Sequence, residues 1–333
     1  MGDQGTSRRK FLGAAAAGVG LAGVGVATGY GIRSVNDGPS GPPQDSLSGV
    51  DPATSRAMAV VPFYGARQAG VTTPQQGQLM FAALDVITKD VGELQQMLAR
   101  WAGMAARMTA GKLVSGLSAP DDQPPFDTGE AMRTGPHSLT ITVGFGPSLF
   151  DKRFGLTRRM PAELVPFGPL PGEEAMNPAI SDGDLCIQAC ANDPLVMFHA
   201  IHSMLRAARG SAVLKWSQLG FGRASSTGAG QPTPLNLMGF KDGTNNIRAD
   251  DTAALDEHVW VPARAGDTET AWMANGTYLV ARKIRMSIEL WDDESRTEQE
   301  RVFGRKKVSG APLTGGQEFT PIDYTKIRAN TRS

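Results

Sequence analysis

The chain has 333 residues, with 33 Lys and Arg against 33 Asp and Glu, so its formal net charge is zero. Because the charges balance and no long basic run occurs, we expect no nucleic-acid partner. An apolar content of 41% and a charged content of 20% are ordinary for a globular protein, and the length allows one large or two modest domains.

Residues 1–35 are typical of an export signal. The hexapeptide SRRKFL at residues 7–12 resembles the twin-arginine pattern, and the Ala- and Gly-rich run after it is too mildly apolar to span a bilayer with confidence. We therefore expect the twin-arginine translocase to export the chain to the periplasm, the cell envelope or the medium, and a basic start followed by an Ala-rich helix is the alternative. Residues 36–54 are rich in Pro, Gly and Ser and are predicted to be a disordered linker.

A first globular domain is predicted over residues 55–222. The apolar run 57–65 is expected to be its first strand, and apolar residues spaced by three and four predict a helix over 89–108. Residues 138–146 alternate as a second strand.

The same domain continues with a strand over 184–191 and a helix that begins at Pro194, capped by Asp193, and runs to about residue 208. A fourth strand follows over 211–221. The order β-α-β-β-α-β predicts a ferredoxin-like (split βαβ) unit with an antiparallel sheet.

A second unit of the same kind is expected over residues 235–333. It has a long alternating segment, 277–291, predicted as a strand, and then a polar segment, 292–307, predicted as a helix. No further strong element follows, so the second unit is expected to be incomplete. The predicted fold class is α+β, with tandem ferredoxin-like units.

Two cysteines, Cys186 and Cys190, lie four residues apart on the strand predicted over 184–191. That spacing separates them by ~13 Å, which is too far for a disulfide. We expect both to be small buried hydrophobic residues, and we expect no metal site.

The segment NLMGFKDGTNNI, residues 236–247, holds one carboxylate, Asp242, next to Gly243 and three residues after Gly239. Glycines at such positions allow the backbone to approach a flat ligand closely. A turn carboxylate without further function is the alternative.

This segment resembles the G-x-x-D-G motif of the dye-decolorising (DyP-type) haem peroxidases, in the exported branch that includes deferrochelatases. Further segments match the family in the same order, from about residue 57 to residue 313. They include AVVPFYGARQAGVTTP (59–74), TVGFGPSLF (142–150), CANDP (190–194), ARKIRMSIELWD (281–292) and EQERVFGRKKVSGAPL (298–313).

The resemblance implies haem b (iron protoporphyrin IX) as the cofactor. Asp242 would lie on the peroxide-binding face as the distal acid/base, because splitting peroxide requires a proton to move between its two oxygens. Gly243, Thr244 and Asn245 would line the haem, and Arg305 would pair with a propionate. A solvated helix-end arginine is the alternative for Arg305.

The family also uses an axial histidine after the segment matching residues 310–313, and a distal arginine later still. No histidine follows His258 in this chain. His199 and His202 roughly share a helix face, so at least one is expected to be a core or interface residue, and His137 is expected to be solvated. A ligand role for His199, His202 or His258 is the alternative. We leave the axial position unassigned and expect a chain that lacks the segment supplying both groups.

Three functions remain open from the sequence. The first is a peroxidase that uses hydrogen peroxide to oxidise dyes, phenols or porphyrins, with small aromatic or porphyrin reductants as partners. The second is an exported protein that binds haem or releases its iron, and the third is an inactive fragment. The resemblance also allows a homo-oligomer.

Overall fold

A computed structural model describes residues 58–115, 119–165, 176–222 and 232–326. The chain divides into two units, Met1–Ser48 and Gly49–Ser333, and all described residues belong to the second. The predicted export signal and linker lie outside the described residues. The first part of the described chain contains β1 (Gln78–Val86), α2 (Val91–Thr109), β2 (Thr140–Phe145), β3 (Leu185–Ala191), α3 (Pro194–Ala207) and β4 (Ala212–Phe221).

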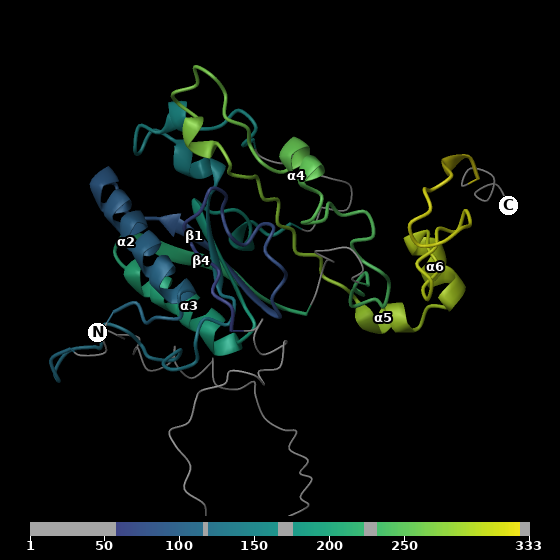
Figure 1. The fold of residues 1–333 in the computed structure, drawn as a ribbon, viewed down its shortest axis with the longest axis horizontal. Helices are drawn as coiled ribbons and strands as arrows, with labels where there is room; N and C mark the ends of the chain where they lie inside the picture. The colour runs from purple at the N-terminus through teal and green to yellow at the C-terminus, as the bar shows by residue number, and fades with distance from the viewer. Residues whose placement is uncertain (1–57, 116–118, 166–175, 223–231, 327–333) are drawn as a thin grey trace, which may run out of the picture. The chain divides into compact units, whose positions relative to one another are not determined.

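These strands form one four-stranded sheet in the order β2-β3-β1-β4. Every neighbouring pair is antiparallel, and the register places Ala82 of β1 opposite Ile187 of β3 and Ser217 of β4. This order and the β-α-β-β-α-β succession confirm the ferredoxin-like prediction for this part of the chain. Figure 1 shows α2 and α3 side by side along the sheet.

The first strand along the chain is β1, at residues 78–86. The prediction that the first strand lies at residues 57–65 was therefore wrong. Residues 58–65 contain no strand; Pro62 has no backbone N–H, and Val60 and Tyr64 are exposed. The true strand, QLMFAALDV, is rich in Leu, Met and Ala, which favour helices by propensity. Its place between β3 and β4 overrides that preference.

The two helices begin where aspartates cap them. The Asp90 carboxylate accepts hydrogen bonds from the backbone N–H groups of Gly92 and Glu93, and Asp193 caps the helix that starts at Pro194 in the same way. Both helices therefore start within two residues of their predicted positions.

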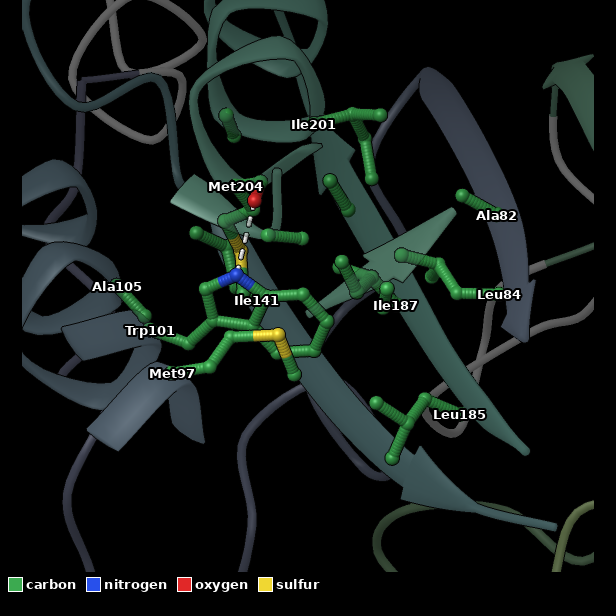
Figure 2. Packing of buried hydrophobic residues seen from close by; sticks show 14 of the residues in the cluster. Ala82, Leu84, Met97, Trp101, Ala105, Ile141, Leu185, Ile187, Ile201 and Met204 are labelled. Carbon is green, nitrogen blue, oxygen red and sulfur yellow. Dashed lines mark hydrogen bonds between the residues drawn. The ribbon is translucent and has the colours of Figure 1, made fainter. Parts of the chain in front are cut away.

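The core lies between these helices and one face of the sheet. Trp101 of α2 is fully buried, and its indole N–H donates to the backbone oxygen of Met204 on α3 at 2.8 Å. Figure 2 shows this bond among side chains from both helices and the central strands. Alternate strand residues point into this core because side chains of a strand alternate between its faces; they include Ala82, Leu84, Ile141, Leu185 and Ile187.

The start of β3 is tied to the rest of the sheet by Asp184. Its carboxylate binds the Arg153 guanidinium at 3.0 and 3.1 Å, the Ser148 hydroxyl at 2.7 Å and the Val86 amide at 2.9 Å. Burial alone would raise the pKa of Asp184, but these hydrogen bonds outweigh burial and hold the pKa below its ordinary value.

The second part of the described chain contains short helices and no strand longer than an isolated bridge. These are α4 (Thr252–His258), α5 (Ile288–Asp292) and α6 (Arg296–Phe303). The strand predicted over 277–291 is therefore wrong: residues 277–287 have no regular structure, and α5 covers the end of the segment. An isolated alternating segment cannot form a strand without a ladder partner, and the described residues offer it none.

Neither cysteine forms a disulfide within the described chain; Cys190 is buried as predicted, whereas Cys186 is half-buried. Burial raises the pKa of each thiol to about 11, so neither is a reactive thiolate at neutral pH. None of the helices in the described chain combines the length and hydropathy needed to cross a lipid bilayer.

Replacing Trp101 with Ala should lower the free energy of unfolding by about 3–5 kcal/mol, because the change leaves a large cavity and removes the hydrogen bond from the indole N–H to the Met204 oxygen. Urea unfolding followed by circular dichroism measures this. Leu219→Ala, at a side chain that is 62% exposed, is the control and should change stability by less than about 0.5 kcal/mol. Equal losses in the two variants would contradict the packing described here.

Asp184→Asn should lower the free energy of unfolding at pH 7 by about 2 kcal/mol, because hydrogen bonds to a charged group are lost. A carboxyl with a lowered folded-state pKa stabilises the fold above its unfolded pKa, near ~4, and loses that effect as the pH falls through the folded pKa. The difference between wild type and variant should therefore shrink below pH ~4 in urea titrations. A difference that stays constant down to pH ~2 would refute the role of the charge.

Candidate active site

The segment around Asp242 is a tight loop organised by Asn236. The Asn236 side-chain oxygen accepts hydrogen bonds from the backbone amides of Met238 and Phe240 at 3.0 and 3.1 Å. The backbone amide of Asn236 donates to the backbone oxygen of Phe240. Gly239 sits at the turn with φ +79°, where an L side chain is strained. The glycine before Phe240 is therefore required by the turn itself.

Phe240 anchors the loop to the helices that follow. Its ring is buried and stacks on Phe303 of α6, with centroids 4.0 Å apart and planes 2° from parallel. Trp291 of α5 meets both rings edge-on and donates its indole N–H to the Met238 oxygen at 3.3 Å. These aromatic contacts hold the loop, α5 and α6 as one cluster.

Asp242 follows directly on this anchored stretch. Its backbone amide donates to the Pro234 oxygen at 2.9 Å, and Leu235 and Lys241 form a bridge beside it. The Asp242 side chain is exposed and forms no hydrogen bond or ion pair with the described residues. The backbone is thus fixed while the carboxylate stays available.

The other predicted haem-lining residues take different positions. Gly243 has φ +95° and is half-buried, and the Asn245 side chain is exposed. The Thr244 hydroxyl donates to the Glu318 carboxylate at 3.3 Å. The structure places the three residues in one turn immediately after Asp242.

Arg305 belongs to the same cluster. It lies two residues after the end of α6, and its Nη1 donates to the backbone oxygens of Gly310 at 2.6 Å and Glu318 at 2.9 Å. These bonds use one nitrogen of the guanidinium, which carries five N–H groups in all. The solvated helix-end alternative does not hold, because Arg305 is half-buried and bound to backbone.

Glu318 belongs to the cluster but was not predicted from the sequence. Its carboxylate accepts hydrogen bonds from Thr233 and Thr244 and forms an ion pair with Lys241. Residues 309–333 show no periodic pattern, so nothing local marked Glu318 as different from a solvated acid. The only available signal was the Gly310–Leu313 match that precedes it.

None of the four histidines forms a hydrogen bond or ion pair with the described residues of the Asp242 loop. His199 is buried against Asp127 at 3.0 Å, and His202 pairs with Glu130 at 2.8 Å. Both bind the segment that carries Asp127 and Glu130, and the burial of His199 agrees with the expectation that at least one of them is a core or interface residue. The other two histidines are His137, whose backbone has φ +45°, and His258, at the exposed end of α4.

A haem site can be tested against these contacts. Pockets that bind small molecules and cofactors measure about 300–1,000 Å³. A cavity in the described residues measures about 70 Å³. It is lined by residues such as Glu163, Arg264 and Tyr278, and by none from the Asp242 loop. No cluster of three metal-ligating side chains occurs in the described residues. The exposed Asp242 carboxylate and the free nitrogens of Arg305 suit the acid/base and propionate contacts of a haem, whereas no described histidine is placed as its axial ligand.

The chain matches known families along both of its parts. Residues 68–222 match the N-terminal domain model of the Dyp-type peroxidases, and residues 233–332 match the C-terminal domain model. The chain belongs to the Dyp-type peroxidase family.

Particular relatives agree with this assignment. A deferrochelatase of Yersinia pestis bv. Antiqua is 37% identical over 267 residues, which cover 80% of this chain and 60% of the relative. The crystal structure of a DyP-type peroxidase from Streptomyces coelicolor has a TM-score of 0.69 at 37% identity, covering 82% of this chain and 70% of that one. Ferric DtpA from Streptomyces lividans has a TM-score of 0.69 at 38% identity, with coverage of 82% and 70%. The chain thus spans about 60% of the length of the curated relative.

Phe240→Ala should loosen the Asp242 loop, because it removes a buried ring and its stack on Phe303. We expect the free energy of local opening of the loop and α6 to fall by about 3 kcal/mol, measured by amide hydrogen exchange. The matched control is Phe319→Ala, at a ring that is 69% exposed, which should leave exchange unchanged. Unchanged exchange in both variants would rule out Phe240 as the anchor.

Proposed function

We propose that this chain takes part in haem-dependent reduction of hydrogen peroxide, with Asp242 as the acid/base. The observation that carries this is the Asp242 loop: its backbone is hydrogen-bonded and its aromatic anchor is buried, yet its carboxylate has no partner in the described residues. A purely structural aspartate in a turn would be expected to bind nearby amides or a cation.

The reaction requires proton movement at peroxide, which a carboxylate can perform. Haem, the cofactor of the family, would supply the iron chemistry that takes up the oxidising power of peroxide. Asp242 would accept a proton from one peroxide oxygen and return it to the other, which would leave as water. Its exposure lets peroxide reach it without displacing another ligand.

Four further residues would contact the cofactor. Gly243 has no side chain to block a flat macrocycle, and Asn245 presents an exposed amide beside it. Arg305 keeps Nη2 and Nε for a propionate, since Nη1 binds backbone. Thr244, which binds Glu318, would contribute mainly through its backbone.

The partners follow from this chemistry. Hydrogen peroxide is the oxidant, and small aromatic compounds such as dyes and phenols, or porphyrins, are the reductants. Export by the twin-arginine translocase to the periplasm, cell envelope or medium rests on the SRRKFL hexapeptide at residues 7–12. By resemblance to the family, we also propose that the protein forms a homo-oligomer.

A second function, release of iron from haem, is favoured by the names of the relatives, since the 37% identical protein from Yersinia pestis is a deferrochelatase. Removing iron leaves two protons on the porphyrin nitrogens, so an acid such as Asp242 would again be needed. Incubation of haem with the protein and a coloured ferrous chelator distinguishes this function from peroxidase turnover.

The decisive variant is Asp242→Asn, which keeps the side-chain size and removes the acid/base. The full chain is titrated with haem, with and without added imidazole to serve as an axial ligand, and binding is followed by the haem absorbance band. We expect both proteins to bind haem within about twofold of each other. Peroxide-driven oxidation of a dye should fall by about 100-fold or more in the variant.

The matched control is Asp250→Asn, in the segment that follows the loop, which should retain full turnover. Equal turnover by wild type and Asp242→Asn would overturn the role of Asp242. Failure of the wild-type chain to bind haem even with imidazole would overturn the proposed cofactor site in this chain.

A further inference from the structure

We propose that Glu318 is a positioning residue for the catalytic loop, holding Asp242 in place by binding the residues on either side of it. This inference rests on the proposed function for its catalytic meaning, and its structural half can be tested without that function.

The first observation is where the bonds of Glu318 go. Lys241 immediately precedes Asp242, and Thr244 follows it by two residues; both side chains bind the Glu318 carboxylate. Thr233, at the other end of the loop, binds it as well. One carboxylate therefore joins three points of the loop that are distant from residue 318 in sequence.

The second observation is burial. The Glu318 side chain is only 12% exposed and that of Lys241 is 24% exposed. Burial alone would raise the pKa of Glu318, but the hydrogen bonds from Lys241 and Thr233 outweigh it and lower the pKa below its ordinary value. A partly buried ion pair whose carboxylate also accepts hydrogen bonds from two threonines is a more rigid link than an exposed pair.

The third observation is that Glu318 is itself held in place. Arg305 donates from one nitrogen to the backbone oxygens of both Gly310 and Glu318. Gly310 lies against the ion pair with φ +72°, and a Cβ there would come within 2.6 Å of the Lys241 side chain. The backbone of segment 310–318 therefore holds the Glu318 carboxylate against the Asp242 loop.

Together these contacts explain how an exposed carboxylate can keep a defined position. Among the described residues, no side chain binds the Asp242 carboxylate to orient it, so its location depends on its backbone. Lys241 and Thr244 restrain that backbone on both sides, and small displacements of a catalytic group are costly to rate.

The test measures loop mobility and turnover in the full chain with three variants. Glu318→Ala removes all three bonds, and Glu318→Gln keeps acceptor capacity for the threonines but loses the ion pair. Glu298→Gln is the control, since Glu298 makes an exposed ion pair with Arg301 on α6, away from the loop. Hydrogen exchange is read for residues 236–246 and, as a check on folding, for β3.

We expect exchange in residues 236–246 to be about tenfold faster in Glu318→Ala, about threefold faster in Glu318→Gln and unchanged in Glu298→Gln. Exchange in β3 should be unchanged in all three. In haem-loaded protein, Glu318→Ala should lower kcat about tenfold and leave KM for the dye unchanged, because it moves the acid/base without touching the reductant.

Unchanged loop exchange in Glu318→Ala would overturn the inference, whatever the activity shows. Normal kcat in Glu318→Ala, in a protein where Asp242→Asn abolishes turnover, would overturn it as well. Faster loop exchange together with normal turnover by Asp242→Asn would support the anchoring by Glu318 and count against the proposed function alone.

Discussion

The pairing of β1 on both of its edges is the constraint on which the described fold depends. β1 hydrogen-bonds to β3 on one side and to β4 on the other, so it joins parts of the chain that are more than one hundred residues apart. Its inner side chains, with those of β3, form the surface on which α2 and α3 pack. Without this strand, neither helix has a sheet to cover. Asp184 would also lose its hydrogen bond to Val86 of β1, and only its bonds to other segments, such as that to Arg153, would remain.

The Asp242 loop is held by a different principle, because no sheet supports it in the described residues. It relies on side chains that converge from separate segments: Phe240 on Phe303 and Trp291, and Glu318 on Lys241 and Thr244. Aromatic stacking fixes the loop at Phe240, and a shielded ion pair fixes it at the next residue, Lys241. The result is a restrained backbone that presents a carboxylate with no hydrogen-bond or ion-pair partner among the described residues.

The sequence was informative wherever the signal was local. Asp90 and Asp193 mark their helices because a capping carboxylate acts within three residues, and Asp242 stands out because glycines surround it. It was misleading where the outcome depends on distant partners. β1 resembles a helix by composition, and residues 277–287 alternate like a strand but find no ladder partner among the described residues.

By itself, the sequence determined the ferredoxin-like order of the first part, the resemblance to the Dyp-type peroxidases and the identity of the candidate acid/base, because periodicity, caps and motifs act over a few residues. Only the tertiary structure decided that β1 is the central strand, that His199 and His202 are bound to Asp127 and Glu130, and that Glu318 lies beneath the Asp242 loop. Each of these depends on contacts between residues about 70 or more positions apart, and such contacts leave no periodic trace in the sequence.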